Sequence, residues 1–147
     1  MMRRLPTFIL NPARLNPADS VDFCGACHRT SADVSLSFIT GIFNLRFPAY
    51  RLEQSRCWGN GDARLTCIAC HDTHKPRVQE AAFYDKVCVG CHSPASAGLK
   101  DRGHATGICK VANHNCVSCH MPKYTIPSMH TDLTDHKIGV HGDQFTE

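Results

Sequence analysis

Apolar positions along the chain occur in short runs rather than in long periodic stretches. The run LSFITGIF, residues 36–43, predicts a short apolar strand or a segment that covers a buried group. The stretch LRFPAYRLEQ, residues 45–54, is interrupted by Pro48 and predicts extended chain. Gly, Pro, Asn and Asp are scattered through the remainder, so we expect loops to dominate the fold.

Two segments have the composition of short helices. SVDFCGACH, residues 20–28, and FYDKVCVGCH, residues 83–92, place an aspartate two or three residues before a cysteine, at a plausible helix start. No apolar stretch approaches the roughly 18 residues that span a bilayer. The opening MMRRLPTFIL has two arginines before an apolar run that Pro6 interrupts, which is not a convincing secretory signal.

Composition adds an anomaly to this picture. The chain has 147 residues, which predicts one domain, yet it contains ten cysteines and ten histidines. This cysteine content is typical of a disulfide scaffold or of metal or cofactor attachment. The formal charge of +3 and the absence of a long Lys/Arg run argue against a nucleic-acid surface. We expect an N-terminal arm at residues 1–20 and one domain at residues 21–147.

Eight of the cysteines belong to a repeated CxxCH pattern. The four copies are Cys24–His28, Cys67–His71, Cys88–His92 and Cys116–His120. In a c-type haem, two cysteines form thioethers with the porphyrin vinyl groups, and the next histidine binds the iron from the same face. The pattern therefore predicts four covalent haems. Their thioether residues would be Cys24, Cys27, Cys67, Cys70, Cys88, Cys91, Cys116 and Cys119. Their proximal ligands would be His28, His71, His92 and His120.

Other uses of paired cysteines explain the pattern less well. Zinc ribbons use CxxC pairs but do not need a histidine directly after each pair. A disulfide framework does not need these histidines either. Thioredoxin-like chemistry uses a single CxxC on a βαβ scaffold, and no such pattern is visible.

Four haems would change the physical character of the chain. About 37 residues would serve each haem, which is too few to bury four porphyrins separately. The expected fold class is therefore a multihaem cytochrome c, with few short α-helices and mostly loops wrapped around a closely packed chain of four haems. With ionised propionates, each oxidised haem contributes about −1, so the net charge falls from +3 to about −1.

Six further histidines can supply the distal iron ligands. His74 cannot cross to the far face of its own haem within three residues, so we expect it to bind a neighbouring haem. His130 and His136 follow the last motif and can fold back over earlier haems. His104 is preferred to His114 as the fourth ligand, because His114 lies close to the last motif. His114 and His141 remain reserves, and His141 is placed to reach a neighbouring subunit.

Two cysteines, Cys57 and Cys109, lie outside the motifs. Haem c is attached in an oxidising compartment, where two spare thiols most simply form one disulfide. The alternative is a pair of buried thiols.

Longer stretches around the motifs carry a family resemblance. These are RFPAYRLEQSRCW, GDARLTCIACHDTH, YDKVCVGCH and CVSCHMPK, with His130 and DHKI downstream. Over roughly residues 20–140 the chain resembles multihaem c-type cytochromes of the doubled-CxxCH or tetrahaem type. The resemblance implies haems in close contact, stacked in alternately parallel and perpendicular pairs. It also implies distal ligation by the second histidine of CHxxH and by the tail histidines, here His74, His130 and His136. Subunits of extracellular cytochrome filaments are similar as well.

The predicted function is electron transfer through four bis-histidine haems in an extracellular or periplasmic conduit, with or without polymerisation into a filament. Since bis-histidine ligation leaves no open iron site, we expect an electron carrier rather than an enzyme. The alternatives are an electron-donating subunit of a larger membrane-associated complex and a small oxidoreductase with one open haem. Other redox proteins or identical subunits would be the partners. We expect an exported protein, because haem c is attached outside the cytoplasmic membrane.

Overall fold

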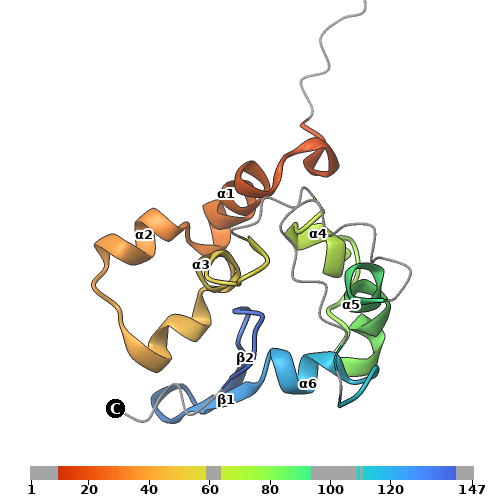
Figure 1. Cartoon of the computed structure of the whole chain (residues 1–147). Helices are drawn as coiled ribbons and strands as arrows, with labels where there is room; N and C mark the ends of the chain where they lie inside the picture. Colours follow the sequence, from red (N-terminus) through yellow and green to blue (C-terminus); the bar gives the residue numbers. More distant parts are fainter. Residues whose placement is uncertain (1–9, 59–63, 94–108, 110, 142–147) are drawn as a thin grey trace, which may run out of the picture.

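The computed structural model of the chain describes residues 10–58, 64–93, 109 and 111–141. Short helices and one small hairpin are arranged in an open ring, with α1, α2 and α3 on one side and α4 and α5 on the other (Figure 1). Helix α6 and the hairpin β1–β2 join the two sides. The α-helices are α1 (Pro17–His28), α2 (Ser31–Leu36), α3 (Pro48–Glu53), α4 (Cys67–Cys70), α5 (Asp85–His92) and α6 (Cys116–His120). The 3-10 helices are η1 (Pro12–Arg14), η2 (Gly41–Arg46), η4 (Ala81–Tyr84) and η6 (Pro127–Met129).

The two predicted motif helices are present, but only one begins where the sequence indicated. α5 starts at Asp85, as expected. α1 starts earlier, at Pro17, and Asn16 caps it by accepting a hydrogen bond from the Asp19 amide at 2.9 Å. Proline at the first helical position and asparagine before it are strong start signals. The predicted start at Asp22 is therefore wrong, and α1 crosses the expected boundary between the arm and the domain.

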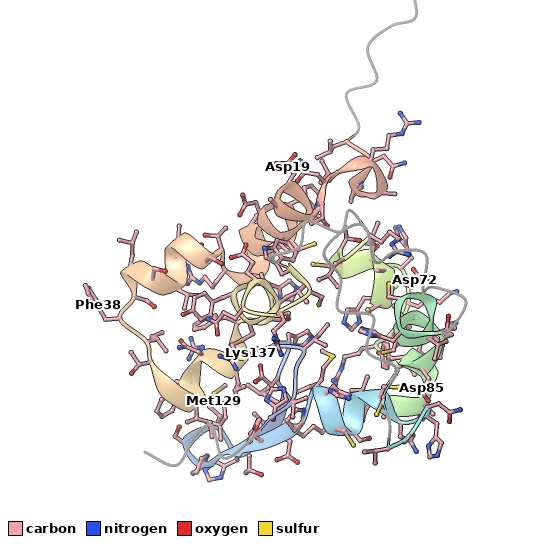
Figure 2. All side chains as sticks on the ribbon, viewed as in Figure 1. Asp19, Phe38, Asp72, Asp85, Met129 and Lys137 are labelled. Atoms are coloured by element: carbon pink, nitrogen blue, oxygen red, sulfur yellow. The ribbon has the colours of Figure 1, made fainter. Side chains whose placement is uncertain are left out.

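The apolar run at residues 36–43 does not form the predicted strand. α2 ends at Leu36, and η2 begins at Gly41. Phe38 and Gly41 have positive φ angles of 55° and 61°, which a regular extended strand does not accommodate. The Phe38 side chain is 89% exposed and points outward from this turn (Figure 2).

The stretch at residues 45–54 is helical rather than extended. Pro48 occupies the first turn of α3, where its missing N–H costs no hydrogen bond. The prediction of extended chain is wrong because Pro48 starts a helix here. α3 is central to the fold, since Ala49, Arg51 and Leu52 are all buried.

The hairpin near the C-terminal end is a short antiparallel pair. β1 (Lys123–Ile126) pairs with β2 (Thr131–Thr134), with Ile126 opposite Thr131. Ile126 is completely buried, and η6 connects the two strands. The hairpin directs the chain that follows β2 back towards α3 (Figure 1).

The hydrophobic core is small for the length of the chain. Val21, Ala49 and Leu52 form a buried cluster, against which four partly buried side chains pack: Trp58, Leu65, Cys67 and Ile138. Many large apolar side chains are exposed instead, including Phe23, Leu36, Phe43, Phe83 and Val89. Within the described residues, no helix is both long enough and apolar enough to span a lipid bilayer.

Two motif glycines differ in the space around them and give a matched pair of variants. A Cβ atom at Gly25 would lie 2.9 Å from Cγ2 and 3.2 Å from Cα of Thr30. At Gly90, within α5, it would meet nothing within 4 Å. Gly25→Ala is expected to destabilise the protein by about 1–3 kcal/mol, the usual cost of overpacking. Gly90→Ala is expected to be neutral or to stabilise by up to about 1 kcal/mol, because alanine favours helix. Denaturant unfolding of both purified variants measures this contrast, and equal midpoints would contradict it.

Candidate functional site

Every CxxCH motif contains a helical turn. The first and third motifs form the ends of α1 and α5, and the fourth coincides with α6. In the second motif α4 consists of the four residues CIAC, and His71 follows directly as its C-cap. Residues three apart in a helix lie on the same face, so each pair of cysteines is presented to one side. This is the local geometry on which the thioether prediction depends.

Cysteine side chains of different motifs lie close to one another. The Cys67 side chain hydrogen-bonds with that of Cys24, and the Cys88 side chain with that of Cys116. Burial, together with the neighbouring Cys24 thiol, raises the pKa of Cys67 to about 12. Burial likewise raises the pKa of Cys88, with an electrostatic contribution from Cys70. The first motif therefore lies beside the second, and the third beside the fourth.

Asp85 links the third motif to the fourth. Its carboxylate accepts hydrogen bonds from the Asn115 amide at 2.7 Å and from the Cys116 amide at 2.9 Å. These bonds, that from Cys116 above all, hold the pKa of Asp85 below its usual range. The first residue of α5 thus caps the start of α6, and Figure 2 shows Asp85 beside α6. Asn115 has a φ of 52°, so the chain turns sharply just before this motif.

The rings of His71 and His136 lie close to each other. Their ring centroids are 6.2 Å apart, with an interplanar angle of 37°. Burial lowers the pKa of both imidazoles, and Arg77 adds to the effect at each. The His136 Nδ1 lies 3.0 Å from the Thr134 carbonyl oxygen, which can only accept, so Nδ1 carries the proton and Nε2 keeps its lone pair. A lowered pKa favours the neutral form of an imidazole, which is the form that binds metals.

His120 is the predicted proximal ligand of the fourth motif, and its ring is oriented by a hydrogen bond like that of His136. Its Nδ1 donates to the Gly139 carbonyl at 2.8 Å, which leaves Nε2 as the nitrogen able to bind iron. The exposed Cys109 thiol also hydrogen-bonds with the His120 side chain. His120 is thus held from the segment that follows β2.

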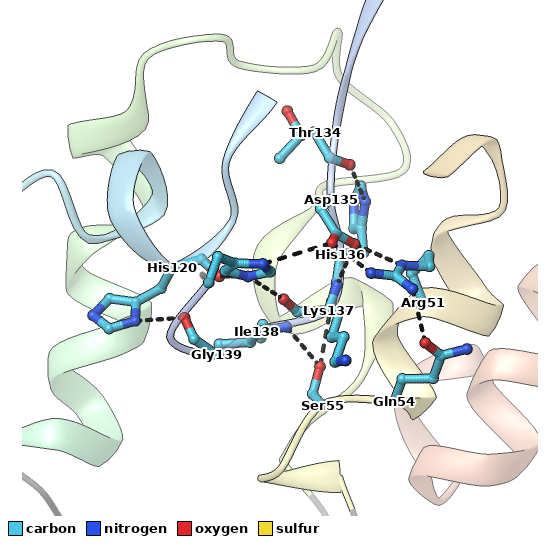
Figure 3. A network of polar contacts seen from close by, with 11 residues as sticks. Arg51, Gln54, Ser55, His120, Thr134, Asp135, His136, Lys137, Ile138 and Gly139 are labelled. Carbon is cyan, nitrogen blue, oxygen red and sulfur yellow. Dashed lines mark hydrogen bonds and ion pairs between the residues drawn. The ribbon is translucent and has the colours of Figure 1, made fainter. Parts of the chain in front are cut away.

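A buried ion pair anchors that segment (Figure 3). The Arg51 guanidinium donates to both oxygens of Asp135, from Nε at 2.8 Å and from Nη2 at 2.6 Å. The Asp135 side chain is fully buried, and that of Arg51 is 8% exposed. Arg51 also donates to Gln54 from Nη1. Such a bidentate pair fixes both the distance and the orientation between α3 and the end of β2.

His141 is an internal residue and does not reach outward to a neighbour. Its side chain is 6% exposed, and its Nε2 contacts the carbonyl oxygens of His120 at 3.0 Å and Lys137 at 2.8 Å. Its Nδ1 is buried without a hydrogen-bond partner, 3.9 Å from the Asp135 carboxylate. The His141 ring is thus turned inward in this structure, and its role as a reserve ligand stays a prediction.

The other predicted ligands are placed at the surface. His28 and His92 are exposed at the ends of α1 and α5. His74 and His130 are also exposed, and His130 has a φ of 48°. His114 is exposed, and its Nδ1 lies 3.3 Å from the side-chain nitrogen of its neighbour Asn115. His104 lies outside the described residues. His71 and His136 are therefore the pair of predicted ligands whose rings the structure brings close together.

The predicted disulfide between Cys57 and Cys109 is not formed in this structure. Both sulfurs are present as thiols, and the Cys109 side chain interacts with His120 instead. The cross-link stays a prediction from composition and compartment.

A zinc site finds no support in the arrangement of the cysteines. Among the described residues, no group of three or more His, Cys, Asp or Glu converges as ligands for one ion.

Comparison with protein-family models, with curated proteins and with solved structures finds no match to this chain.

Sequence reasoning missed the residues that orient the histidines. Gly139 accepts a hydrogen bond from the His120 ring, and Arg51 pairs with Asp135, the residue directly before His136; none of these three residues belongs to a CxxCH motif. The one available signal was the aspartate directly before His136, in the DHKI stretch. Its partner Arg51 lies 84 residues earlier, which no local pattern reveals.

Proposed function

We propose that this protein carries electrons through four covalently attached c-type haems. The observation that carries the proposal is the set of four CxxCH motifs, each containing a helical turn, with the first motif beside the second and the third beside the fourth. The thioether and proximal residues are those of the four motifs. His74, His104, His130 and His136 are the proposed distal ligands. When bound in such a row, haem groups supply one-electron redox chemistry and pass electrons between neighbouring macrocycles.

The distance between His71 and His136 fits an axial pair. Metal–imidazole bonds of about 2.0–2.1 Å, with each ligating nitrogen about 1.2 Å from its ring centre, place two opposed ring centres about 6.4 Å apart. The measured separation is 6.2 Å. His71 and His136 would therefore hold the iron of the haem attached at Cys67 and Cys70. This agrees with the expectation that His74 serves a different haem.

The remaining residues have supporting roles in this proposal. Thr134 and Gly139 hold the Nδ1 protons of His136 and His120, so that Nε2 is the available nitrogen in each ring. The Cys109 thiol contacts the His120 side chain in this structure. If that contact is with Nε2, Cys109 has to move before this nitrogen can bind iron. The exposed apolar side chains and the small core are consistent with a chain that covers a large apolar cofactor surface.

The wider context of this electron transfer is also proposed. An exported protein in an extracellular or periplasmic conduit fits the chemistry of haem attachment, whether as a filament subunit or as the donor subunit of a larger complex. An oxidoreductase with one open haem is the alternative from another class. The surplus of histidines over irons disfavours it, since each iron can obtain a second ligand.

Haem stoichiometry tests the proposal directly. The chain, produced with a signal peptide in a host that matures c-type haems, is expected to retain four haems per chain through denaturation. Intact mass and the pyridine haemochrome spectrum give this number. Replacing both Cys67 and Cys70 with alanine should reduce it to three. The matched variant, with Cys57 and Cys109 replaced by alanine, should retain four. A wild-type chain without covalent haem would refute the proposal.

A further inference from the structure

We infer that residues 135–141 act as one positioning segment for axial histidines of two different haems. The inference rests on the proposed function and adds a physical link between the second and the fourth haem sites. His136 would be the distal ligand opposite His71, and His120 the proximal ligand of the last motif. Neither Arg51 nor Asp135 touches iron in this account, so both are positioning residues.

The segment begins at an anchor with several contacts. The Asp135 carboxylate accepts two hydrogen bonds from Arg51 and one from the Lys137 amide at 2.9 Å. The Asp135 amide donates to the Pro122 carbonyl at 2.9 Å, close to the last motif. Because the carboxylate is completely buried, its position is set by these partners rather than by water.

The anchor fixes the backbone on both sides of His136. The Ser55 hydroxyl donates to the His136 carbonyl at 3.3 Å and accepts from the Ile138 amide at 2.8 Å. The imidazole is turned by the hydrogen bond from its Nδ1 to the Thr134 carbonyl oxygen, which leaves Nε2 as the nitrogen that would bind iron. A shift of residue 135 therefore changes where His136 stands relative to His71.

The far end of the segment holds the fourth motif. The Gly139 amide donates to the His120 carbonyl at 3.2 Å, and the Gly139 carbonyl accepts from His120 Nδ1 at 2.8 Å. The His141 ring contacts the His120 and Lys137 carbonyl oxygens and closes the segment on itself. Both ends are thus connected by a short, heavily hydrogen-bonded stretch of seven residues.

The Asp135→Asn variant tests this connection in the haem-loaded protein. Asparagine keeps the size of the side chain but removes the charge that Arg51 pairs with. Weaker anchoring of His136 is expected to give a partial high-spin signal at one haem, seen by electron paramagnetic resonance or resonance Raman. Weaker hydrogen bonding of His120 makes its imidazole a poorer donor, so the potential of a second haem is expected to shift upward. Two of the four haems should change.

Asp132→Asn is the matched control, because Asp132 is exposed on β2 and its carboxylate accepts from Thr125. It should change none of the four haems. If Asp135→Asn loads poorly, Ser55→Ala provides a milder variant that is expected to move the same two haems less. One pair of results would overturn the inference but not the proposed function. The wild-type protein would have four low-spin haems, and Asp135→Asn or Ser55→Ala would change none of them or only one. A wild-type chain without haem overturns both.

Discussion

Replacing His136 with alanine is expected to convert one of the four haems from a six-coordinate low-spin to a high-spin form. The His71 and His136 rings stand at the separation of an axial pair, and the smaller side chain cannot reach the iron. The other three haems should keep their low-spin spectra, because their ligands lie elsewhere. Optical, electron paramagnetic resonance and resonance Raman spectra of the purified oxidised protein provide the measurement. Added imidazole should restore the low-spin form.

Replacing His136 with methionine is a second test of whether residue 136 binds iron. His136→Met is expected to retain low-spin iron and to raise the potential of that haem by on the order of 0.1 V, within the roughly 0.8 V range that axial ligands control. His114→Ala serves as the control, because His114 is exposed and contacts the adjacent Asn115. Four unchanged low-spin haems in His136→Ala would show that His136 binds no iron.

Replacing Arg51 with methionine is expected to destabilise the protein by about 3–5 kcal/mol, the usual cost of stranding one member of a buried ion pair. The Asp135 carboxylate would remain fully buried without the guanidinium that now donates to both of its oxygens. Denaturant unfolding, followed by circular dichroism with the haem content of each sample checked, measures the loss.

The double variant separates the charge effect from packing. Arg51→Met combined with Asp135→Leu removes both charges and should recover most of the lost stability, because no uncompensated charge remains. Arg46→Met is a suitable control, since Arg46 is exposed and its guanidinium stacks 4.9 Å from the centre of the Phe47 ring. It should cost less than about 1 kcal/mol. A double variant as unstable as Arg51→Met would indicate that packing, not charge, dominates.

Local signals in the sequence predicted some elements well and others badly. The motif helices follow from the spacing of cysteine and histidine, and the start of α5 from Asp85. The run at residues 36–43 was misread because its apolar character does not reveal the positive φ angles of Phe38 and Gly41. Pro48 was misread because a proline can begin a helix as readily as it interrupts an extended stretch.

The candidate site was predictable in its residue types but not in its pairing. The CxxCH pattern identifies the cysteines and the adjacent histidines without knowledge of the fold. Which tail histidine faces which motif depends on the hairpin, and this is why His136 meets His71 while His141 turns to backbone carbonyls. The Arg51–Asp135 pair depends on tertiary packing alone and has no local signature.

That pair also bears on the order in which the protein assembles. Its two members are 84 residues apart, so the loop between them must close before the contact forms. Arg51 and the first two motifs leave the ribosome well before Asp135 and His136. The N-terminal half therefore cannot complete its fold until the C-terminal tail has been synthesised. The second CxxCH motif should acquire His136 only after the last motif has been synthesised and exported.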